Sequence, residues 1–215
     1  MLYNCKLNLP EPLTPTAFEH LVEKKLNGIN TSSNKYLYVD TDISNLNPLL
    51  LEIFKSLNLT PSVIKMFGFL DRINWTQTVH IIHSDLVRLN NSWIKHPFAI
   101  NWELADNEAE FCWWDVGDTP EAYPAVDDVD VNDLISLHAR GVHYGHRMNF
   151  KIAPHYQIVD KYPLTTSNAL AINTGIPHSV VGKINQQPRC GLSIQFPLDQ
   201  IQTWNKGLEL FKDYI

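Results

Sequence analysis

The feature that most constrains the fold is a series of short apolar or alternating segments, separated by turn residues, that starts near residue 63. The segments read VIKMFGFL, TQTVHIIH, FAINWEL, EFCWWDV, ALAINTGI, HSVVGKI and RCGLSIQF. Side chains alternate across a strand with a period of two, and these segments lack the 3.6-residue period of a helix. Short strands spaced by turns favour an antiparallel β core of the sandwich or barrel type.

The flanking segments predict helices beside this core. AFEHLVEKKLN and, after the predicted strand KYLYVDTD, ISNLNPLLLEIFKSLNL carry apolar residues at helical spacing, and the tail IQTWNKGLELFKDYI predicts a C-terminal helix. Pro48 is tolerable because it falls in the first turn of its helix. We therefore expect a mainly β protein with flanking helices (α+β), in which residues 1–62 buttress a domain of residues 63–215. At 215 residues, the two parts should form one structural domain.

Composition excludes several classes of protein. The content of 44% hydrophobic and 19% charged residues is that of a folded chain, and a net charge of -6 provides no attraction to nucleic acid or to anionic lipid. The three cysteines are scattered without a CxxC pair, so neither a disulfide framework nor a thiolate zinc site is expected. No secretory leader and no apolar run of about 20 residues is visible, so we expect a cytoplasmic protein without a membrane partner.

Residues 115–161 predict a long polar loop insertion, and long loops in compact domains are usually functional or mobile. Three histidines gather there and could bind zinc or copper, but their spacing fits no structural zinc pattern, so a solvated loop is favoured. These are His138, His143 and His146. If the loop instead closes over a site, the side chains that would contact an anionic substrate are Arg140, Tyr144 and Arg147.

The segment TVHIIHSDLVRLN contains a candidate metal-binding pair. Alternation along a strand places His83 and Asp85 on one face, where an imidazole and a carboxylate two positions apart can reach the same ion. The alternative is a turn at the end of a strand, in which Asp85 caps local backbone groups.

Two later segments add polar residues. ALAINTGIPHSVVG presents His178 at the start of a strand, where a histidine is more often a hydrogen-bonded core residue than a ligand. In RCGLSIQF the residues Arg189, Gly191, Ser193 and Gln195 share one face. The simplest interpretation of that pattern is a strand with one wet face.

Taken in order, His83-x-Asp85, then His178, then Arg189 on the last strand, the sequence resembles the Fe(II)/2-oxoglutarate-dependent oxygenase superfamily. The resemblance covers approximately residues 63–196 and is strongest in HIIHSD, in FAINWEL with FCWWD, and in ALAINTGIPHSVV with PRCGLSIQF. It implies a double-stranded β-helix, a jelly-roll or cupin-like barrel. It also implies an enzyme that couples oxidative decarboxylation of 2-oxoglutarate to oxidation of a small-molecule or peptidyl substrate.

The resemblance also implies roles for individual residues. His83, Asp85 and His178 would bind Fe(II), leaving positions open for the cosubstrate 2-oxoglutarate and oxygen. Arg189 would bind the distal carboxylate of 2-oxoglutarate, because a planar guanidinium grips a carboxylate through two hydrogen bonds. We expect Arg189 in the same cavity, on the strand next to His178.

The sequence departs from the family pattern after that arginine. Many members place Ser or Thr two residues on, where this chain has Gly191, so Ser193 is the candidate for a second cosubstrate contact. Asn101 matches a position where relatives often offer a polar side chain near the cosubstrate; the alternative is an Asn on the exposed face of a strand.

Two further interpretations concern the barrel as a whole. In FCWWD only one of Trp113 and Trp114 can face the interior, and core packing is the expected role of that one. The rival function is a cupin-like barrel that binds metal or a small ligand without oxidation, since fold does not settle function. The usual cupin pattern has a Glu shortly after two close histidines, which HIIHSDLVRLN lacks.

Overall fold

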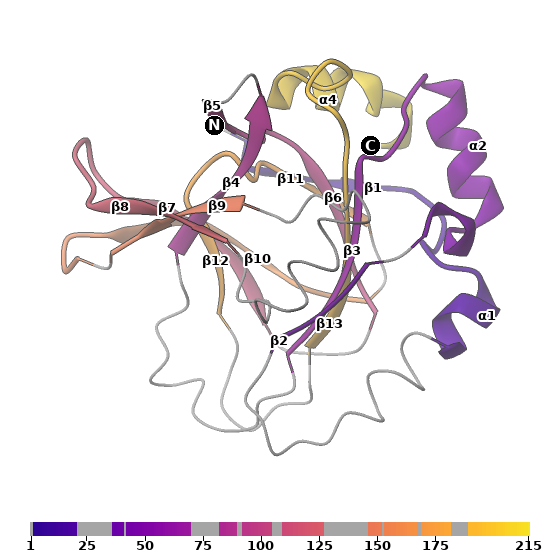
Figure 1. Ribbon diagram of the computed structural model, residues 1–215, viewed down its shortest axis with the longest axis horizontal. Coiled ribbons are helices and arrows are strands. Elements are labelled where there is room, and N and C mark those ends of the chain that lie inside the picture. Colours follow the sequence, from indigo (N-terminus) through magenta and orange to yellow (C-terminus); the bar gives the residue numbers. More distant parts are fainter. Residues whose placement is uncertain are drawn as a thin grey trace.

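The computed structural model describes residues 2–20, 36–40, 42–69, 82–89, 92–104, 109–126, 146–151, 153–166, 169–181 and 189–215. Within these residues the strands form two antiparallel sheets, of six and seven strands (Figure 1). The six-stranded sheet has the order β1 (Asn4–Leu7), β11 (Ala169–Ile172), β6 (Ala99–Glu103), β13 (Arg189–Gln195), β3 (Val63–Phe69), β2 (Tyr36–Asp40). The seven-stranded sheet has the order β10 (Gln157–Pro163), β7 (Glu110–Asp115), β12 (His178–Val181), β4 (Ile82–Leu89), β9 (His146–Phe150), β8 (Ala122–Val126), with β5 (Ser92–Lys95) paired to β4. The expected mainly β architecture is confirmed.

Successive core strands mostly alternate between the two sheets. β3 lies in the six-stranded sheet and β4 in the other, and the same change of sheet separates β6 from β7, β11 from β12 and β12 from β13. The expectation that Arg189 lies on the strand next to His178 is therefore wrong. β12 pairs with β4 and β7, whereas β13 pairs with β3 and β6, because the chain crosses between the sheets after β12.

The two faces of β13 have different surroundings. Leu192 and Ile194 belong to a buried cluster that also contains Leu50 and Phe54 of α2 (Pro48–Ser56). Because side chains alternate along a strand, Ser193 and its neighbours at even spacing point the other way, toward the seven-stranded sheet. This alternation is what gives the space between the sheets a polar wall.

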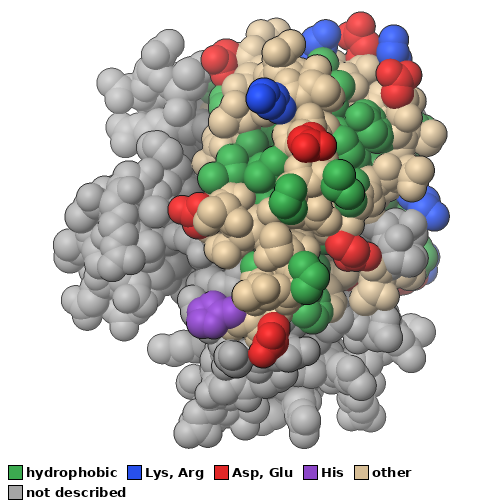
Figure 2. Space-filling view, turned by 90° about the vertical axis from the view of Figure 1, so that its right-hand side faces the viewer, with side chains coloured by type: hydrophobic (Ala, Val, Ile, Leu, Met, Phe, Trp, Pro, Cys, Tyr) green, Lys and Arg blue, Asp and Glu red, His purple; other side chains and the backbone are tan. Residues whose placement is uncertain are grey.

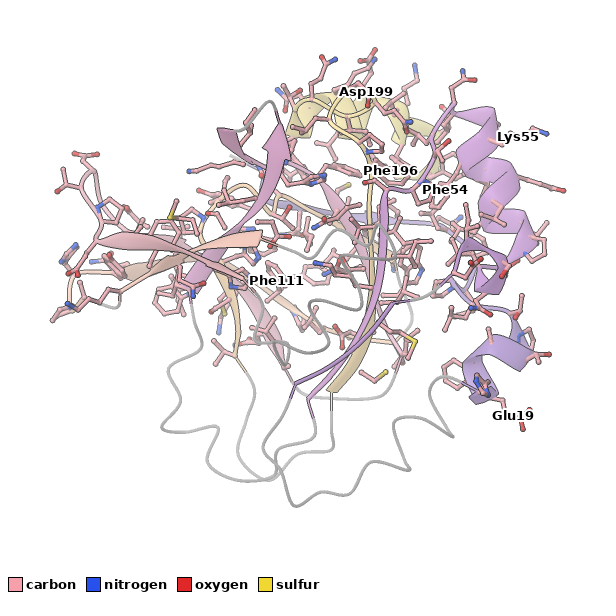
Figure 3. The ribbon with its side chains drawn as sticks, in the orientation of Figure 1. Glu19, Phe54, Lys55, Phe111, Phe196 and Asp199 are labelled. Atoms are coloured by element: carbon pink, nitrogen blue, oxygen red, sulfur yellow. The ribbon has the colours of Figure 1, made fainter. Side chains whose placement is uncertain are left out.

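The helices that precede β3 lie beside the outer face of the six-stranded sheet, on the side away from the other sheet, and the C-terminal helix lies across one end of the sheets (Figure 1). The helices are α1 (Pro15–Phe18), α2, α4 (Trp204–Leu210) and the short turns η2 (Ile43–Asn45) and η3 (Lys212–Tyr214). α2 begins where the Asn47 side chain accepts from the Leu49 N–H and Pro48 occupies the first turn. Phe54 and Phe196 then meet edge to face beneath it, with ring centroids 5.2 Å apart (Figure 3).

Only part of the first predicted helix lies within the described residues. α1 ends at Phe18, and residues 21–35, which include most of the rest of that prediction, lie outside the described residues.

On the face shown in Figure 2, acidic, basic and apolar side chains are interspersed. Of the helices in the described parts of the chain, none is both long and apolar enough to span a membrane.

A second apolar cluster fills part of the space between the sheets. Its buried members are Ala99, Ala109, Phe111, Trp113, Leu164, Leu170 and Ile172. Trp113 is fully buried there and its indole N–H donates to the carbonyl of Asn173 at 3.3 Å, whereas Trp114 points to the outer face and donates to Ser179 Oγ at 2.9 Å. The expectation that one of the two tryptophans faces the interior and packs there is confirmed.

The loop predicted over residues 115–161 is wrong in part. The segment contains β8, β9 and the first residues of β10, and β9 pairs with both β4 and β8. The proline of β8, which cannot donate to a ladder, is tolerated because β8 lies at the edge of its sheet. His138, Arg140, His143 and Tyr144 lie outside the described residues, and of His146 and Arg147 only the backbone in β9 is described.

Candidate metal centre

Three side chains, His83, Asp85 and His178, each bring one potential ligand atom to within 4.8 Å of the others. His83 and Asp85 lie on one face of β4, and His178 opens β12 directly opposite His83 in the register of the two strands. The two imidazole rings are 4.4 Å apart between centroids. The three residues that the sequence assigned to one site thus lie together.

The backbone around Asp85 is fixed from both sides. Its N–H donates to the carbonyl of Thr174 at 2.8 Å, and its carbonyl accepts from the N–H of His96 at 2.9 Å. The alternative of a capping Asp85 in a strand-end turn is wrong, because β4 continues to Leu89. β4 instead carries the His-x-Asp pair within a paired strand, which fixes the direction of both side chains.

His178 is held in the form that binds a metal. The side chain is buried, and its Nδ1–H donates to the carbonyl of Ile176 at 2.8 Å, since a carbonyl can only accept. Burial, followed by the neighbouring His83, lowers the pKa of His178 to about 4, although Asp85 and the Ile176 carbonyl oppose this. At neutral pH the ring is therefore uncharged, with the lone pair of Nε2 available.

Asp85 directs its two carboxylate oxygens to different partners. Oδ1 lies 3.8 Å from Nε2 of His83, whereas Oδ2 accepts from Nε2 of Gln195 at 2.8 Å. The side chains of His83 and Asp85 are 23% and 24% exposed. An ion held between them and the buried His178 would therefore have one side open to small molecules.

Aromatic side chains form the wall behind His178. The ring of Phe111, which is labelled in Figure 3, stacks on its imidazole at 5.0 Å and 18°. Trp113 lies opposite His178 in the β12–β7 register. These contacts fix the plane of the imidazole and keep water from its buried side.

The residues predicted to hold 2-oxoglutarate are described unequally. The backbone of Arg189 opens β13, but its side chain lies outside the described part of the structure. Ser193 is half-buried and pairs in register with Asn101, which is 7% exposed. The alternative of an exposed Asn101 is wrong. Its Oδ1 has no hydrogen-bond partner among the described residues, so this interior face carries an unused acceptor.

The sequence did not single out three polar residues near the centre. Alternation places Gln195 on the same face of β13 as Ser193, but the sequence alone assigned it no role beyond that of a wet face. Asn149 could not have been found from the sequence, because it falls in the predicted loop. It lies opposite His83 in the β4–β9 register and is buried, and its Oδ1 has no partner among the described residues. His96 is also buried and donates from Nε2 to the carbonyl of Phe196 at 2.8 Å.

The donor set fits a divalent first-row transition metal. Two borderline imidazole nitrogens and one hard carboxylate oxygen together suit iron and its neighbours, and three protein ligands leave coordination positions for other molecules. The fold and the site together define a β-rich protein with a candidate His-x-Asp…His metal centre.

No protein-family model matches the sequence, and no curated protein does. One similar solved structure is HygX from Streptomyces hygroscopicus with nickel and 2-oxoglutarate bound, at 10% identity and a TM-score of 0.41, covering 87% of this chain and 80% of that one. Another is AviO1 from Streptomyces viridochromogenes Tue57, at 12% identity and a TM-score of 0.36, covering 90% and 89%. At these TM-scores the likenesses are too distant to carry a functional argument.

Proposed function

We propose that the protein is an Fe(II)- and 2-oxoglutarate-dependent oxygenase acting on a small-molecule or peptidyl substrate. The observation that carries the proposal is the convergence of His83, Asp85 and His178, whose ligand atoms lie within 4.8 Å of one another. Two imidazoles and a carboxylate make the facial triad of non-haem Fe(II) oxygenases.

The strand order supports a double-stranded β-helix as the scaffold. In one sheet the neighbouring strands are β3, β13, β6 and β11, and in the other they are β4, β12, β7 and β10. The two sets of four face each other. Two four-stranded sheets with the chain passing between them make a jelly roll. β1 and β2 extend the edges of the first sheet, while β9 and β8 extend the second beyond β4.

Within the proposed site, the residues of this chain bind and orient. Bound Fe(II) would supply the chemistry that uses oxygen to decarboxylate 2-oxoglutarate and oxidise the substrate. Nε2 of His178 is aimed by the Nδ1–H bond to Ile176, and Phe111 excludes water from the buried side of that ring. Arg189 is the proposed partner of the distal carboxylate, with Ser193 and Asn101 as further polar contacts.

The second candidate is a cupin-like barrel that binds metal or a small ligand without oxidation. It shares every described feature of the metal centre, so what separates the two is the cosubstrate. We also propose that residues 1–62 buttress a core of residues 63–215 within one domain, and that the protein is cytoplasmic.

The test is an anaerobic titration of the Fe(II)-loaded protein with 2-oxoglutarate, monitored in the visible spectrum. Chelation of Fe(II) by a 2-oxoacid produces a weak metal-to-ligand charge-transfer band, which we expect for the parent and not for Asp85→Ala. Admitting oxygen together with ascorbate, the two-electron reductant that replaces the unidentified substrate, should then convert 2-oxoglutarate to succinate and CO₂. If Fe(II) binds but neither the band nor succinate appears, the barrel without oxidation becomes the better interpretation.

A further inference from the structure

We infer that Gln195 is a positioning residue for the metal centre, which holds one oxygen of Asp85 so that the other is presented to the metal. This inference rests on the proposed function. It starts from the 2.8 Å hydrogen bond that the Gln195 amide donates to Oδ2 of Asp85, between residues 110 positions apart in the chain.

The bond joins the two sheets at the metal centre. Gln195 ends β13 in the six-stranded sheet, and Asp85 lies on β4 in the seven-stranded one. On β6 the residue in register with Gln195 is Ala99, whose small side chain leaves the long amide room to extend.

The direction of the amide follows from chemistry. An ionised carboxylate can only accept hydrogen bonds, so the NH₂ end of Gln195 must face Asp85. The backbone carbonyl of Gln195 is itself held by the Ser62 N–H at 2.9 Å. The backbone of Gln195 is therefore fixed at the point from which its side chain extends to Asp85.

The bond removes the main freedom that Asp85 retains. Its backbone N–H and carbonyl are already engaged by Thr174 and His96, so what remains is rotation of the carboxylate about the side-chain bonds. With Oδ2 held by Gln195, Oδ1 is left on the side of His83, 3.8 Å from its Nε2.

This arrangement favours binding through a single oxygen. A free carboxylate can chelate an ion with both oxygens and occupy two coordination positions. With Oδ2 bound to Gln195, Asp85 would occupy one coordination position instead of two. The position left open is needed because a bidentate 2-oxoacid and oxygen together require three. Hydrogen bonds of this kind to metal ligands typically change metal affinity by about 10- to 100-fold.

The experiment uses Co(II) as a spectroscopic probe with the full-length chain. Gln195→Met removes the amide at nearly constant size. The matched control is Gln200→Met, which removes another glutamine that bridges distant segments, through a 2.8 Å bond from the Thr60 N–H to its Oε1, away from the metal centre. For each protein we would measure the Co(II) dissociation constant, the d–d absorption bands and the melting temperature.

We expect Gln195→Met to raise the Co(II) dissociation constant about 10- to 100-fold, because the Asp85 carboxylate is no longer oriented by its hydrogen-bonded partner. The d–d bands should weaken, because a second carboxylate oxygen raises the coordination number. Gln200→Met should bind Co(II) with the parent affinity and spectrum. A merely structural role for Gln195 would lower the melting temperature without changing the spectrum, and that result would overturn the inference.

Failure of the positioning role of Gln195 can be distinguished from failure of the proposed function. If the parent binds Co(II) and Asp85→Ala does not, but Gln195→Met matches the parent, the positioning role is rejected and the metal centre stands. If the parent itself does not bind Co(II), the proposed function is rejected and the inference with it. Should Gln195→Met fail to fold, Gln195→Asn provides the same test, because its shorter side chain cannot span the distance to Oδ2; parent-like Co(II) binding there would also reject the inference.

Discussion

The imidazole rings of His83 and His178 face each other across the β4–β12 pair, with centroids 4.4 Å apart and ring planes at 56°. Two imidazoles so close repel each other when both are positively charged. His83 is accordingly the second cause, after burial, of the lowered pKa of His178. The buried ring of His178 is thereby kept neutral at pH 7, with Nε2 free to bind a metal cation.

Removal of His178 should abolish tight metal binding while preserving the fold. We expect His178→Ala to weaken Co(II) or Fe(II) binding by more than about 100-fold, since loss of a ligand exceeds the effect of losing a ligand's hydrogen-bonded partner. The matched control is His155→Ala, because His155 is exposed and lies outside the group of ligands. Isothermal titration with Co(II) measures both, and equal affinities would reject His178 as a ligand.

Acidification should destabilise the metal-free protein through His178. Its pKa is about 4 when folded against 6.5 when unfolded, so the unfolded chain binds the extra proton between these values. The contribution is complete above pH 6.5 and is lost as the pH falls toward 4, by about 3 kcal/mol in all. Urea unfolding with a chelator at pH 7.5 and pH 5 should register about 2 kcal/mol of this loss. His178→Gln should show a smaller loss of stability; the same loss as in the parent would contradict the prediction.

Arg189→Ala should weaken 2-oxoglutarate but spare metal binding. A bidentate, charge-assisted contact in a partly desolvated pocket is worth about 2–5 kcal/mol, or about 30- to several-thousand-fold in affinity. Titration of the metal-loaded variant with 2-oxoglutarate tests this, with Lys206→Ala as a control because Lys206 is exposed on α4. Unchanged affinity would place Arg189 outside the cosubstrate site and favour the barrel without oxidation.

Asn101→Leu should separate stability from cosubstrate binding. The buried Oδ1 of Asn101 has no partner among the described residues, so replacing the amide with an apolar group of similar size should cost little stability. If the Asn101 NH₂ group donates to a carboxylate of 2-oxoglutarate, the variant should lose about 10- to 150-fold in affinity, the worth of one hydrogen bond to a charged group. Thermal unfolding and cosubstrate titration are the two measurements. A large loss of stability with parent affinity would make Asn101 structural.

Gly207→Ala should destabilise the protein although alanine favours helices. A Cβ at Gly207 would lie 2.2 Å from Cδ2 of Phe98, a fully buried ring that stacks on Phe211 at 5.8 Å. Overpacking of this kind costs about 1–3 kcal/mol, against a gain of about 1 kcal/mol from helix propensity. Asn205→Ala, on the exposed side of the same helix, should instead be neutral or stabilising. Chemical denaturation compares the two, and a stabilised Gly207→Ala would mean that α4 can move away from Phe98.

The sequence by itself determined the features that depend on local periodicity. Alternation predicted the strands β3, β6, β7, β11, β12 and β13. It also placed His83 and Asp85 on one face of β4 without reference to any tertiary contact. It also put Ser193 and Gln195 on one face of β13. These features follow from the two-residue repeat of a strand, which is set by neighbouring residues alone.

Only the tertiary structure decided which strands pair and what meets across the sheets. It turned part of a predicted loop into β8 and β9, placed Arg189 and His178 in different sheets, and brought Gln195 to Asp85 over 110 positions. The physical reason is that pairing between distant strands depends on register and on where the chain crosses between sheets. Both are fixed by the packing of the whole core, and no short segment of the sequence encodes them.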